Sequence, residues 1–350
     1  MPIKKKTAQK VKNLMNNKEN SPDGIVLLAK QSGLTSFSSL YSVKKALNTK
    51  KVGHTGTLDS FAQGLLVVCT GRLTKLAGNI TEFDKTYKAV IKFGEETDTL
   101  EYTGKIIKKA PLPSAKAFHN SLKKFTGTLK QKPPLFSAIH IDGKRASDLA
   151  RNGENAEIPE REITVFNSEL LDEKLNSQGL VEYALVEFSV SKGTYIRSLA
   201  RDIALDCNSA GHLTGLFRTK VGDFSVKAAA GYSLLEDFSI ENAVKASKAF
   251  LENKEKEAFN EDLLQAEIRE KLLSFSEEVA KACGFISVHL ASQAAERDFY
   301  NGKPLKNALF IENLFELPCN SIISVFFEKK FIGIINKGPE GRISYRFVIH

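Results

Sequence analysis

Long apolar segments are missing from this chain of 350 residues, which has a mean hydropathy of −0.21. No uninterrupted apolar run approaches the ~20 residues that a bilayer-spanning helix needs, so a membrane-spanning segment is excluded. The amino terminus is rich in lysine but lacks the apolar stretch of a secretory signal, and export is not expected. We therefore expect the protein to act in the cytoplasm.

Motifs for disulfides, metals and nucleotide cofactors are missing as well. The four cysteines lie far apart and form no CxxC pair: Cys69, Cys207, Cys283 and Cys319. This spacing indicates reduced, buried thiols rather than a disulfide scaffold or a zinc knuckle. No GxGxxG or GxxxxGKS/T loop follows a predicted strand, which disfavours dinucleotide-binding and P-loop folds. The histidines show no metal-ligand spacing, and we predict no metal.

Acidic residues are outnumbered, 41 against 50 lysines and arginines, and the net charge of +9 makes nucleic acid the first partner to consider. The length suits one large domain plus a smaller one. Composition divides the chain into a basic flexible tail, a dense mixed segment, a solvated helical connector and a small β-rich domain: residues 1–23, 24–235, 236–283 and 284–350.

Strand and helix patterns alternate irregularly, which predicts the α+β class. Apolar runs and period-two alternation predict strands at 25–28, 65–68, 87–93, 163–171, 181–190, 322–327 and 331–335. Helical spacing predicts one helix capped by Ser36, a second opened by Pro113 and Ser114, and a third over 196–203.

The segment Gly53–Leu66 contains residue types that folding alone explains poorly. Two glycines, Gly53 and Gly56, allow a tight turn or the close approach of another chain. His54 and Asp59 are polar, and loops at strand ends are where sites are usually built. Taken alone, a glycine-rich turn with a solvated aspartate is the simpler explanation.

This segment closely resembles the signature of the TruB family of tRNA pseudouridine synthases, Gly-His-Thr-Gly-x-Leu-Asp-Pro-x-Ala-x-Gly-Leu-Leu, with Ser60 in place of the proline. Further blocks resemble family motifs in the family's order: Lys85–Ala89, Pro133–Ala138 with Gly143–Arg145, Gly193–Leu199 and Gly211–Thr219. The opening Asp-Lys-Pro-x-Gly of the family is replaced by Ala29–Gly33. The resemblance implies a mixed, mostly antiparallel sheet flanked by helices over residues 24–235, and a PUA-like RNA-binding domain over 284–350.

The activity implied by the resemblance is the isomerisation of uridine 55 to pseudouridine in the T-loop of tRNA. The bond from C1′ to N1 breaks and the uracil rejoins through C5, which requires no redox change and no cofactor. A carboxylate near the ribose and a closed site are required. The resemblance assigns Asp59 as the catalyst and Arg197 as the cation that keeps a carboxylate charged in a dry pocket.

Substrate-binding roles follow from the same resemblance. Tyr87 would stack on the extruded base and take part in proton transfer, while Tyr195 and Leu216 would close the uracil pocket. His54 would enter the T-loop stack when the target base is flipped out. Basic side chains predicted to contact RNA phosphates are Lys30, Lys75, Lys144 and Arg145.

Several alternatives stay open. A tRNA-binding folding chaperone without catalysis would show the same basic charge and RNA-binding tail, and a guide-dependent enzyme would share the chemistry but not the substrate. The sequence leaves undecided whether Asp59 attacks C1′, attacks C6 or assists elimination. We expect a monomer that binds the T-loop and acceptor arm of tRNA without an obligatory protein partner.

Overall fold

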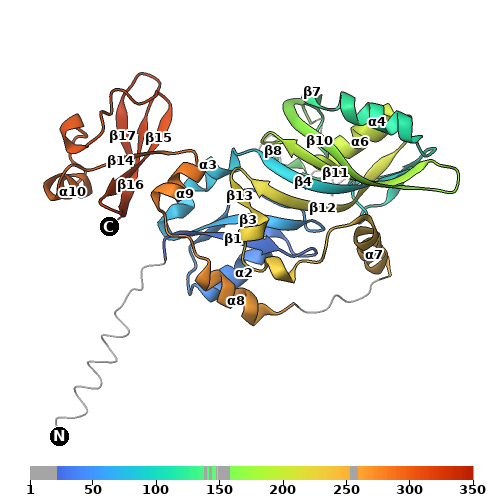
Figure 1. Cartoon of the computed structure of the whole chain (residues 1–350), viewed down its shortest axis with the longest axis horizontal. Helices are drawn as coiled ribbons and strands as arrows, with labels where there is room; N and C mark the ends of the chain where they lie inside the picture. Colours follow the sequence, from blue (N-terminus) through green and yellow to red (C-terminus); the bar gives the residue numbers. More distant parts are fainter. Residues whose placement is uncertain are drawn as a thin grey trace, which may run out of the picture.

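A large and a small sheet organise the molecule, with the small one at one end of the large one (Figure 1). The structure is a computed structural model that describes residues 22–137, 140–141, 144–146, 148, 158–252 and 259–349. The predicted flexible tail thus lies outside the described residues except for Pro22 and Asp23. Asp23 is held in place, since Arg72 Nε donates to its Oδ2 at 2.8 Å.

The large sheet has the strand order β1-β3-β12-β4-β11-β10-β7 in the described residues, with β2 beside β3 and β13 beside β12. Its strands are β1 (Gly24–Lys30), β2 (Val52–His54), β3 (Gln63–Thr70), β4 (Lys85–Phe93), β7 (Gly127–Gln131), β10 (Arg161–Leu175), β11 (Val181–Val190), β12 (Gly211–Val221) and β13 (Phe224–Ser225). All of these pairs are antiparallel except β3 with β12. The mixed, mostly antiparallel sheet is therefore confirmed.

The small sheet has the order β14-β15-β16-β17 and confirms the β-rich carboxyl-terminal region. Its strands are β14 (Ile286–His289), β15 (Ser321–Phe327), β16 (Lys330–Lys337) and β17 (Ile343–Val348). Two short hairpins complete the strands: β5 (Glu95–Thr97) with β6 (Ile106–Lys109), and β8 (His140–Ile141) with β9 (Lys144–Arg145).

Helices cover both sheets (Figure 1). They are α2 (Ser36–Ala46), α3 (Ala77–Thr81), α4 (Ala115–Lys124), α6 (Ile196–Asp206), α7 (Ile240–Leu251), α8 (Glu261–Glu270), α9 (Glu277–Ala282) and α10 (Gln293–Tyr300). Short 3₁₀ helices in the described residues are η1 (Gly71–Leu76), η2 (Val226–Ala228), η3 (Tyr232–Leu234) and η4 (Asn307–Leu309). Across the described ranges, none of the helices has the length and apolarity to cross a membrane.

The sequence predicted side-chain caps for two of these helices, α2 and α4. The predicted cap of α4 is confirmed, because Ser114 Oγ accepts from Ala117 N at 3.2 Å. For α2 the cap is one residue earlier than predicted: Thr35 Oγ1 accepts from Ser38 N at 3.0 Å. Ser36 is left free for another contact, which proves to involve the candidate site.

The two faces of β4 pack against different layers. Tyr87, Ala89 and Ile91 alternate into a core shared with α4 and α6, whereas Val90 points the other way and packs with Ile240 of α7. The period-two pattern read from the sequence is confirmed, and it fixes the face on which Tyr87 lies.

The connector contains the expected helices, but they are exposed to solvent on one face only. Leu264 and Ile268 of α8 are buried against α2 and β1, and Ala280 of α9 is buried between the two sheets. Acidic residues cover the outer surface of α8, whereas its apolar residues at i and i+4 spacing face the core. The connector therefore packs on the large sheet.

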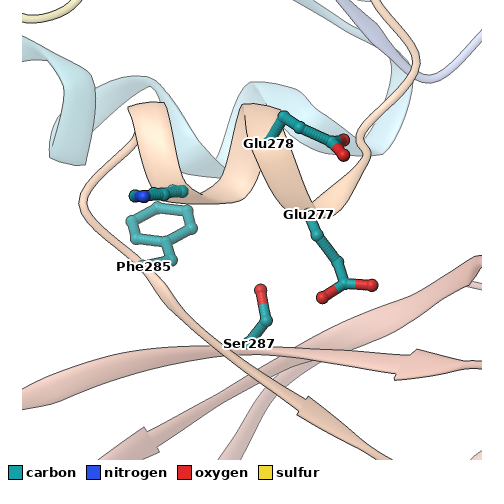
Figure 2. A pocket seen from close by; sticks show the side chains of 5 residues that line it. Glu277, Glu278, Phe285 and Ser287 are labelled. Carbon is teal, nitrogen blue, oxygen red and sulfur yellow. The ribbon is translucent and has the colours of Figure 1, made fainter.

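Aromatic rings join the small sheet to the large one. Phe331 of β16 stacks at 4.3 Å, centroid to centroid, on Phe275, and both belong to a core that includes Leu65 of β3. An open cavity of about 370 Å³ lies where α9 passes the small sheet (Figure 2), and its lining residues are Glu277, Glu278, Lys281, Phe285 and Ser287. The buried aromatic contact shows that the two sheets share a core and are not joined by a bare linker.

Candidate active site

The loop between β2 and β3 contains Asp59, and the first residue of α2 together with the chain just before it holds this loop in place. Ser36 Oγ accepts from Leu58 N at 2.8 Å and donates to Leu58 O at 2.9 Å. On the other side of Asp59, Gly33 N donates to Ser60 O at 2.7 Å. Asp59 is thus flanked by fixed backbone on both sides.

A buried arginine of β12 supports the same loop from beneath. Arg218, only 2% exposed, donates from Nε to Leu65 O at 2.7 Å and from its two terminal nitrogens to Thr57 O and Gly56 O, each at 3.3 Å. Gly64 has a φ of +118°, and a Cβ there would lie 2.4 Å from Arg218 O. Only glycine fits this close approach between β3 and β12.

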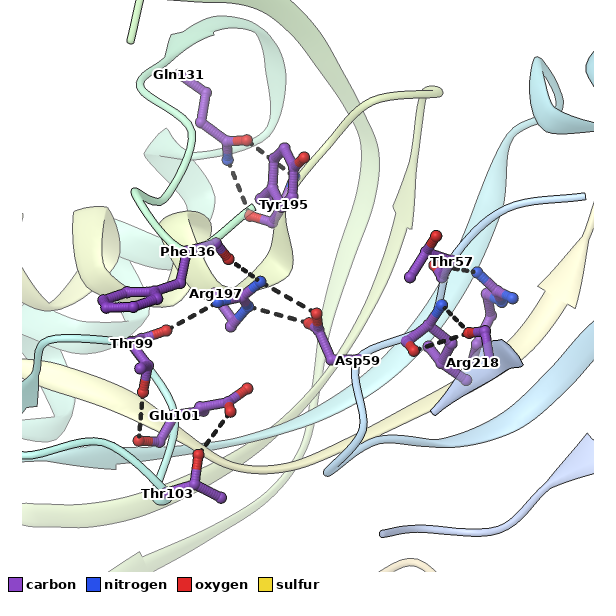
Figure 3. Close-up of polar contacts among 12 residues, drawn as sticks. Thr57, Asp59, Thr99, Glu101, Thr103, Gln131, Phe136, Tyr195, Arg197 and Arg218 are labelled. Atoms are coloured by element: carbon purple, nitrogen blue, oxygen red, sulfur yellow. Dashed lines mark hydrogen bonds and ion pairs between the residues drawn. The ribbon is translucent and has the colours of Figure 1, made fainter. Parts of the chain in front are cut away.

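The central feature of the site is the ion pair between Asp59 and Arg197 (Figure 3). Arg197 Nε lies 3.0 Å from Asp59 Oδ2, and Nη2 lies 3.1 Å from Oδ1. Such a two-pronged contact fixes both the position and the orientation of the carboxylate. The guanidinium is 5% exposed and the carboxylate side chain 31%, so the pair is closed on the arginine side and open on the aspartate side.

Arg197 also donates to two backbone carbonyls. Nη1 donates to Thr99 O at 2.9 Å and Nη2 to Phe136 O at 3.0 Å. Arg197 lies in the first turn of α6, whose start is fixed by Gln131: its amide accepts from Tyr195 N and donates to Tyr195 O. The guanidinium is therefore held by three separate parts of the chain.

Glu101 also belongs to the site, although no sequence motif indicated it. Burial raises its pKa to about 7; the negative charge of Asp59 adds to the rise, and Arg197 opposes it. Thr103 Oγ1 donates to the carboxyl at 2.6 Å. Figure 3 shows Glu101 below the ion pair. The only sequence signal was an acid next to Leu100 and Tyr102 in an otherwise polar turn.

Tyr87 and Leu216 lie on neighbouring strands beneath the loop. In the ladder of β4 and β12, Tyr87 pairs with Arg218 and Ala89 pairs with Leu216. Both side chains are buried in the cluster that also contains Leu58, the neighbour of Asp59. The structure thus brings both predicted residues to the floor of the site.

Tyr195 lies at the start of α6, two residues before Arg197, and its ring is half-buried. The guanidinium carbon of Arg161 lies 4.7 Å from the ring centroid, a cation–π contact that orients the ring. Its role at the rim of the uracil pocket stays a prediction.

His54 ends β2, where it pairs with Val68 of β3. Burial lowers its pKa, and the positive charge of Arg218 lowers it further. Its Nδ1 is buried and has no hydrogen-bond partner among the described residues. A neutral, half-buried imidazole beside the loop suits contact with an uncharged base face better than contact with a phosphate.

The prediction that Lys30 contacts phosphate is wrong. Lys30 is 1% exposed, and its ammonium donates to Leu34 O at 2.6 Å, to Gln31 O at 3.0 Å and to Ser60 O at 3.4 Å. These carbonyls belong to the segment that holds the loop of Asp59, so the charge is used inside the protein.

Of the other predicted phosphate contacts, Lys75 is exposed, and its Nζ lies 5.3 Å from the centroid of Phe347 in β17. This contact links η1 to β17, and the contact of Lys75 with RNA stays a prediction. Lys144 and Arg145 form β9, but their side chains lie outside the described residues, as does Gly143.

Comparison with known proteins gives concordant matches. The family model described as TruB family pseudouridylate synthase, N-terminal domain, matches residues 44–196. A tRNA pseudouridine synthase B of Treponema denticola is 44% identical over 336 residues, which cover 89% of this chain and 94% of the relative. A protein of the same name from Borreliella burgdorferi is 44% identical over 232 residues, covering 66% of this chain and 78% of the relative.

Solved structures show the same fold. A chain in the crystal structure of a Cbf5-Nop10-Gar1 complex aligns with a TM-score of 0.61 at 20% identity, covering 93% of this chain and 84% of that one. A chain of the archaeal box H/ACA sRNP Nop10-Cbf5 complex aligns with a TM-score of 0.60 at 18% identity, covering 94% and 86%. At these identities the likeness concerns the fold alone.

Proposed function

The chain belongs to the TruB family of pseudouridylate synthases, and on that premise we propose that it is a stand-alone tRNA pseudouridine synthase that isomerises uridine 55 of the T-loop with Asp59 as its catalyst. The observation that supports this most directly is the ion pair of Asp59 and Arg197. It presents a fixed carboxylate that is open on one side only. On the closed side of the pair, the Arg197 guanidinium also donates to the carbonyls of Thr99 and Phe136.

The reaction is balanced by the substrate itself. The bond from C1′ to N1 breaks, a bond from C1′ to C5 forms, C5 loses a proton and N1 gains one. Asp59 supplies a negative oxygen next to the ribose and base, as nucleophile or as base, while Arg197 offsets the cost of holding that charge away from bulk water.

Glu101 must not compete with Asp59 for the guanidinium. Its pKa of about 7 leaves a large fraction of this carboxyl protonated at neutral pH, so the site does not hold two full negative charges against one cation. We therefore assign Asp59 the charged role and Glu101 the role of a supporting acid.

The flipped uracil is proposed to sit on the floor of the site. Tyr87 offers an aromatic face, Leu216 an apolar wall, and Tyr195 closes the rim from the start of α6. His54, neutral and half-buried beside the loop, takes the space that the extruded nucleotide leaves in the T-loop stack.

The domain assignment is part of the proposal. Residues 24–235 form the catalytic domain, 236–283 the connector and 284–350 a PUA-like domain that binds the acceptor side of tRNA, with Lys75 among the phosphate contacts. The packed core between the two sheets supports this role, because a second RNA contact on the small sheet would then lie at a fixed distance from Asp59. We propose that the protein acts as a monomer in the cytoplasm and needs no partner protein.

Tritium release tests the proposal. Purified full-length protein is mixed with unmodified tRNA labelled with tritium at C5 of its uridines, and total RNA treated in the same way is mapped for pseudouridine. The proposal predicts release from tRNA and one modified site in the T-loop. Binding without release would indicate a chaperone, and inactivity without a guide RNA would indicate a guide-dependent enzyme.

A further inference from the structure

The outer surface of α2 exposes two large aromatic side chains one helical turn apart. Phe37 is 72% exposed and Tyr41 66%. In the described part of the chain, neither ring packs on another aromatic ring, and the Nζ of Lys44 lies 5.1 Å from the centroid of Phe37. Exposed aromatic side chains beside lysines are what single-stranded nucleic acid binds, since bases stack on the rings and phosphates pair with the amines.

These residues form one continuous stripe. Phe37, Tyr41, Lys44 and Lys45 are spaced i, i+4, i+7 and i+8, so they share one side of the helix, which we call the α2 stripe. Along the axis it extends about 12 Å at ~1.5 Å per residue, which equals the spacing of three or four nucleotides at ~3.4 Å each.

Charge favours an anionic partner here. No acidic residue occurs between Gly24 and Leu58, and the stretch after α2 adds the exposed lysines Lys50 and Lys51. Acids do lie at one border, where Ser42 Oγ donates to Glu261 of α8 at 3.2 Å. Those acids would repel RNA, so its path follows the side of α2 away from α8.

The stripe begins at the catalytic loop. Ser36, the residue before Phe37, exchanges two hydrogen bonds with Leu58, and Asp59 is the next residue after Leu58. At its other end α2 leads through a short turn into β2, which ends at His54. An RNA strand whose base reaches Asp59 would therefore pass close to the amino-terminal end of α2, which carries Phe37.

We propose that the α2 stripe binds the RNA strand adjacent to the target nucleotide, with Phe37 and Tyr41 stacking on unpaired bases and Lys44 and Lys45 contacting phosphates. This inference rests on the proposed function, because it assigns a further contact surface to the same substrate. It names a binding surface and no step of the chemistry.

Equilibrium binding of unmodified tRNA by the full-length protein tests the proposal. The Phe37→Ala/Tyr41→Ala variant is expected to raise the Kd for tRNA by about tenfold or more, because each lost stacking contact is substantial. Phe37→Trp keeps an aromatic ring on which a base can stack, so this variant is expected to bind tRNA with the wild-type Kd. Phe166→Ala, which removes an aromatic side chain 52% exposed on β10, serves as the matched control and is expected to change nothing.

Salt dependence supplies a second readout. Lys44→Gln/Lys45→Gln is expected to lower the slope of log K against log salt by about 1.4, or ~0.7 for each lost phosphate contact. Thermal unfolding of every variant checks that the fold is intact.

A Kd within about twofold of the wild type for Phe37→Ala/Tyr41→Ala overturns the inference, and so does a change confined to self-association or to binding of another protein. These results are separable from failure of the proposed function. In that case the wild-type protein itself would release no tritium from tRNA.

Discussion

Two buried arginines contact the loop of Asp59 from different sides, and they do different work (Figure 3). Among the described residues, Arg218 donates hydrogen bonds to backbone carbonyls alone, those of Gly56, Thr57 and Leu65. Arg197 meets two carbonyls and, in addition, the carboxylate of Asp59. One cation therefore sets the shape of the loop, and the other sets the position of a charge.

The difference shows that one arginine fixes the conformation of the loop, whereas the other positions the reactive carboxylate. All three nitrogens of Arg218 donate to neutral carbonyls of the protein, and the side chain is buried, so this side of the loop presents no charge to a substrate. On the Arg197 side the carboxylate remains 31% exposed, so its charge is available to a bound nucleotide. The same substitution should thus lower mainly the activity at Arg197 and mainly the stability at Arg218.

Arg197→Lys is expected to lower the single-turnover rate by about 100-fold, because an ammonium cannot make the two-pronged contact that orients Asp59. The measurement is tritium release at saturating tRNA.

Arg218→Lys is the matched variant. It is expected to lower the free energy of unfolding by about 1 to 3 kcal/mol, because buried carbonyls lose their donors, while activity well below the melting temperature falls less than about tenfold. Equal losses of activity in both variants would contradict the division between the two arginines.

Gly64→Ala tests the structural role of Arg218 from the neighbouring strand β3. The added Cβ would lie 2.4 Å from Arg218 O in a backbone with φ of +118°, so we expect a loss of about 2 to 4 kcal/mol in the free energy of unfolding. Gly53→Ala is the control, since the closest atom its Cβ would meet lies 3.9 Å away. Denaturant unfolding of both variants would show whether the close approach of β3 and β12 matters.

Glu101→Gln tests the second carboxyl through pH. The native pKa of about 7 lies above the ordinary 4.5, so the native state holds this proton more tightly than the unfolded chain does. The resulting stabilisation is complete below pH 4.5 and is lost as the pH rises to about 7. Glutamine does not ionise, so the variant should gain about 1 to 3 kcal/mol relative to the wild type between pH 4.5 and pH 8. A pH-independent difference would contradict the placement of Glu101.

The smallest effects are expected from substitutions of Lys75 and Lys30, both of which the sequence predicted to contact RNA phosphates. Lys75→Gln should lower the salt slope of tRNA binding by less than about 1 without changing stability. Lys30→Gln should leave the slope unchanged and lower the melting temperature, because buried carbonyls lose their donor. Salt titrations and thermal unfolding of both variants distinguish surface charge from buried charge.

Local pattern predicted much of the fold. The alternation along β4, the cap of α4 and the class of the sheet are all confirmed. The same kind of signal was available for α8, where Leu264 and Ile268 lie at i and i+4, yet its acidic composition suggested a solvated helix. Composition averages over both faces of a helix, whereas packing depends on one.

The site was predictable only through its motif. Asp59 and Arg197 are 138 residues apart, and no local rule brings them together. Lys30 was misassigned because its partners are carbonyls of an irregular turn, which leave no mark in the sequence. Glu101 was missed because its perturbed pKa comes from burial and from Asp59, both tertiary effects.

Asp59→Asn is the most direct test of the central claim, since it removes one charge at little steric cost. Tritium release and the Kd for unmodified tRNA should be measured on the same preparation. We expect no tritium release above background from Asp59→Asn, with a Kd for tRNA within about twofold of the wild type. Comparable tritium release by Asp59→Asn would contradict the assignment of Asp59 as the catalyst.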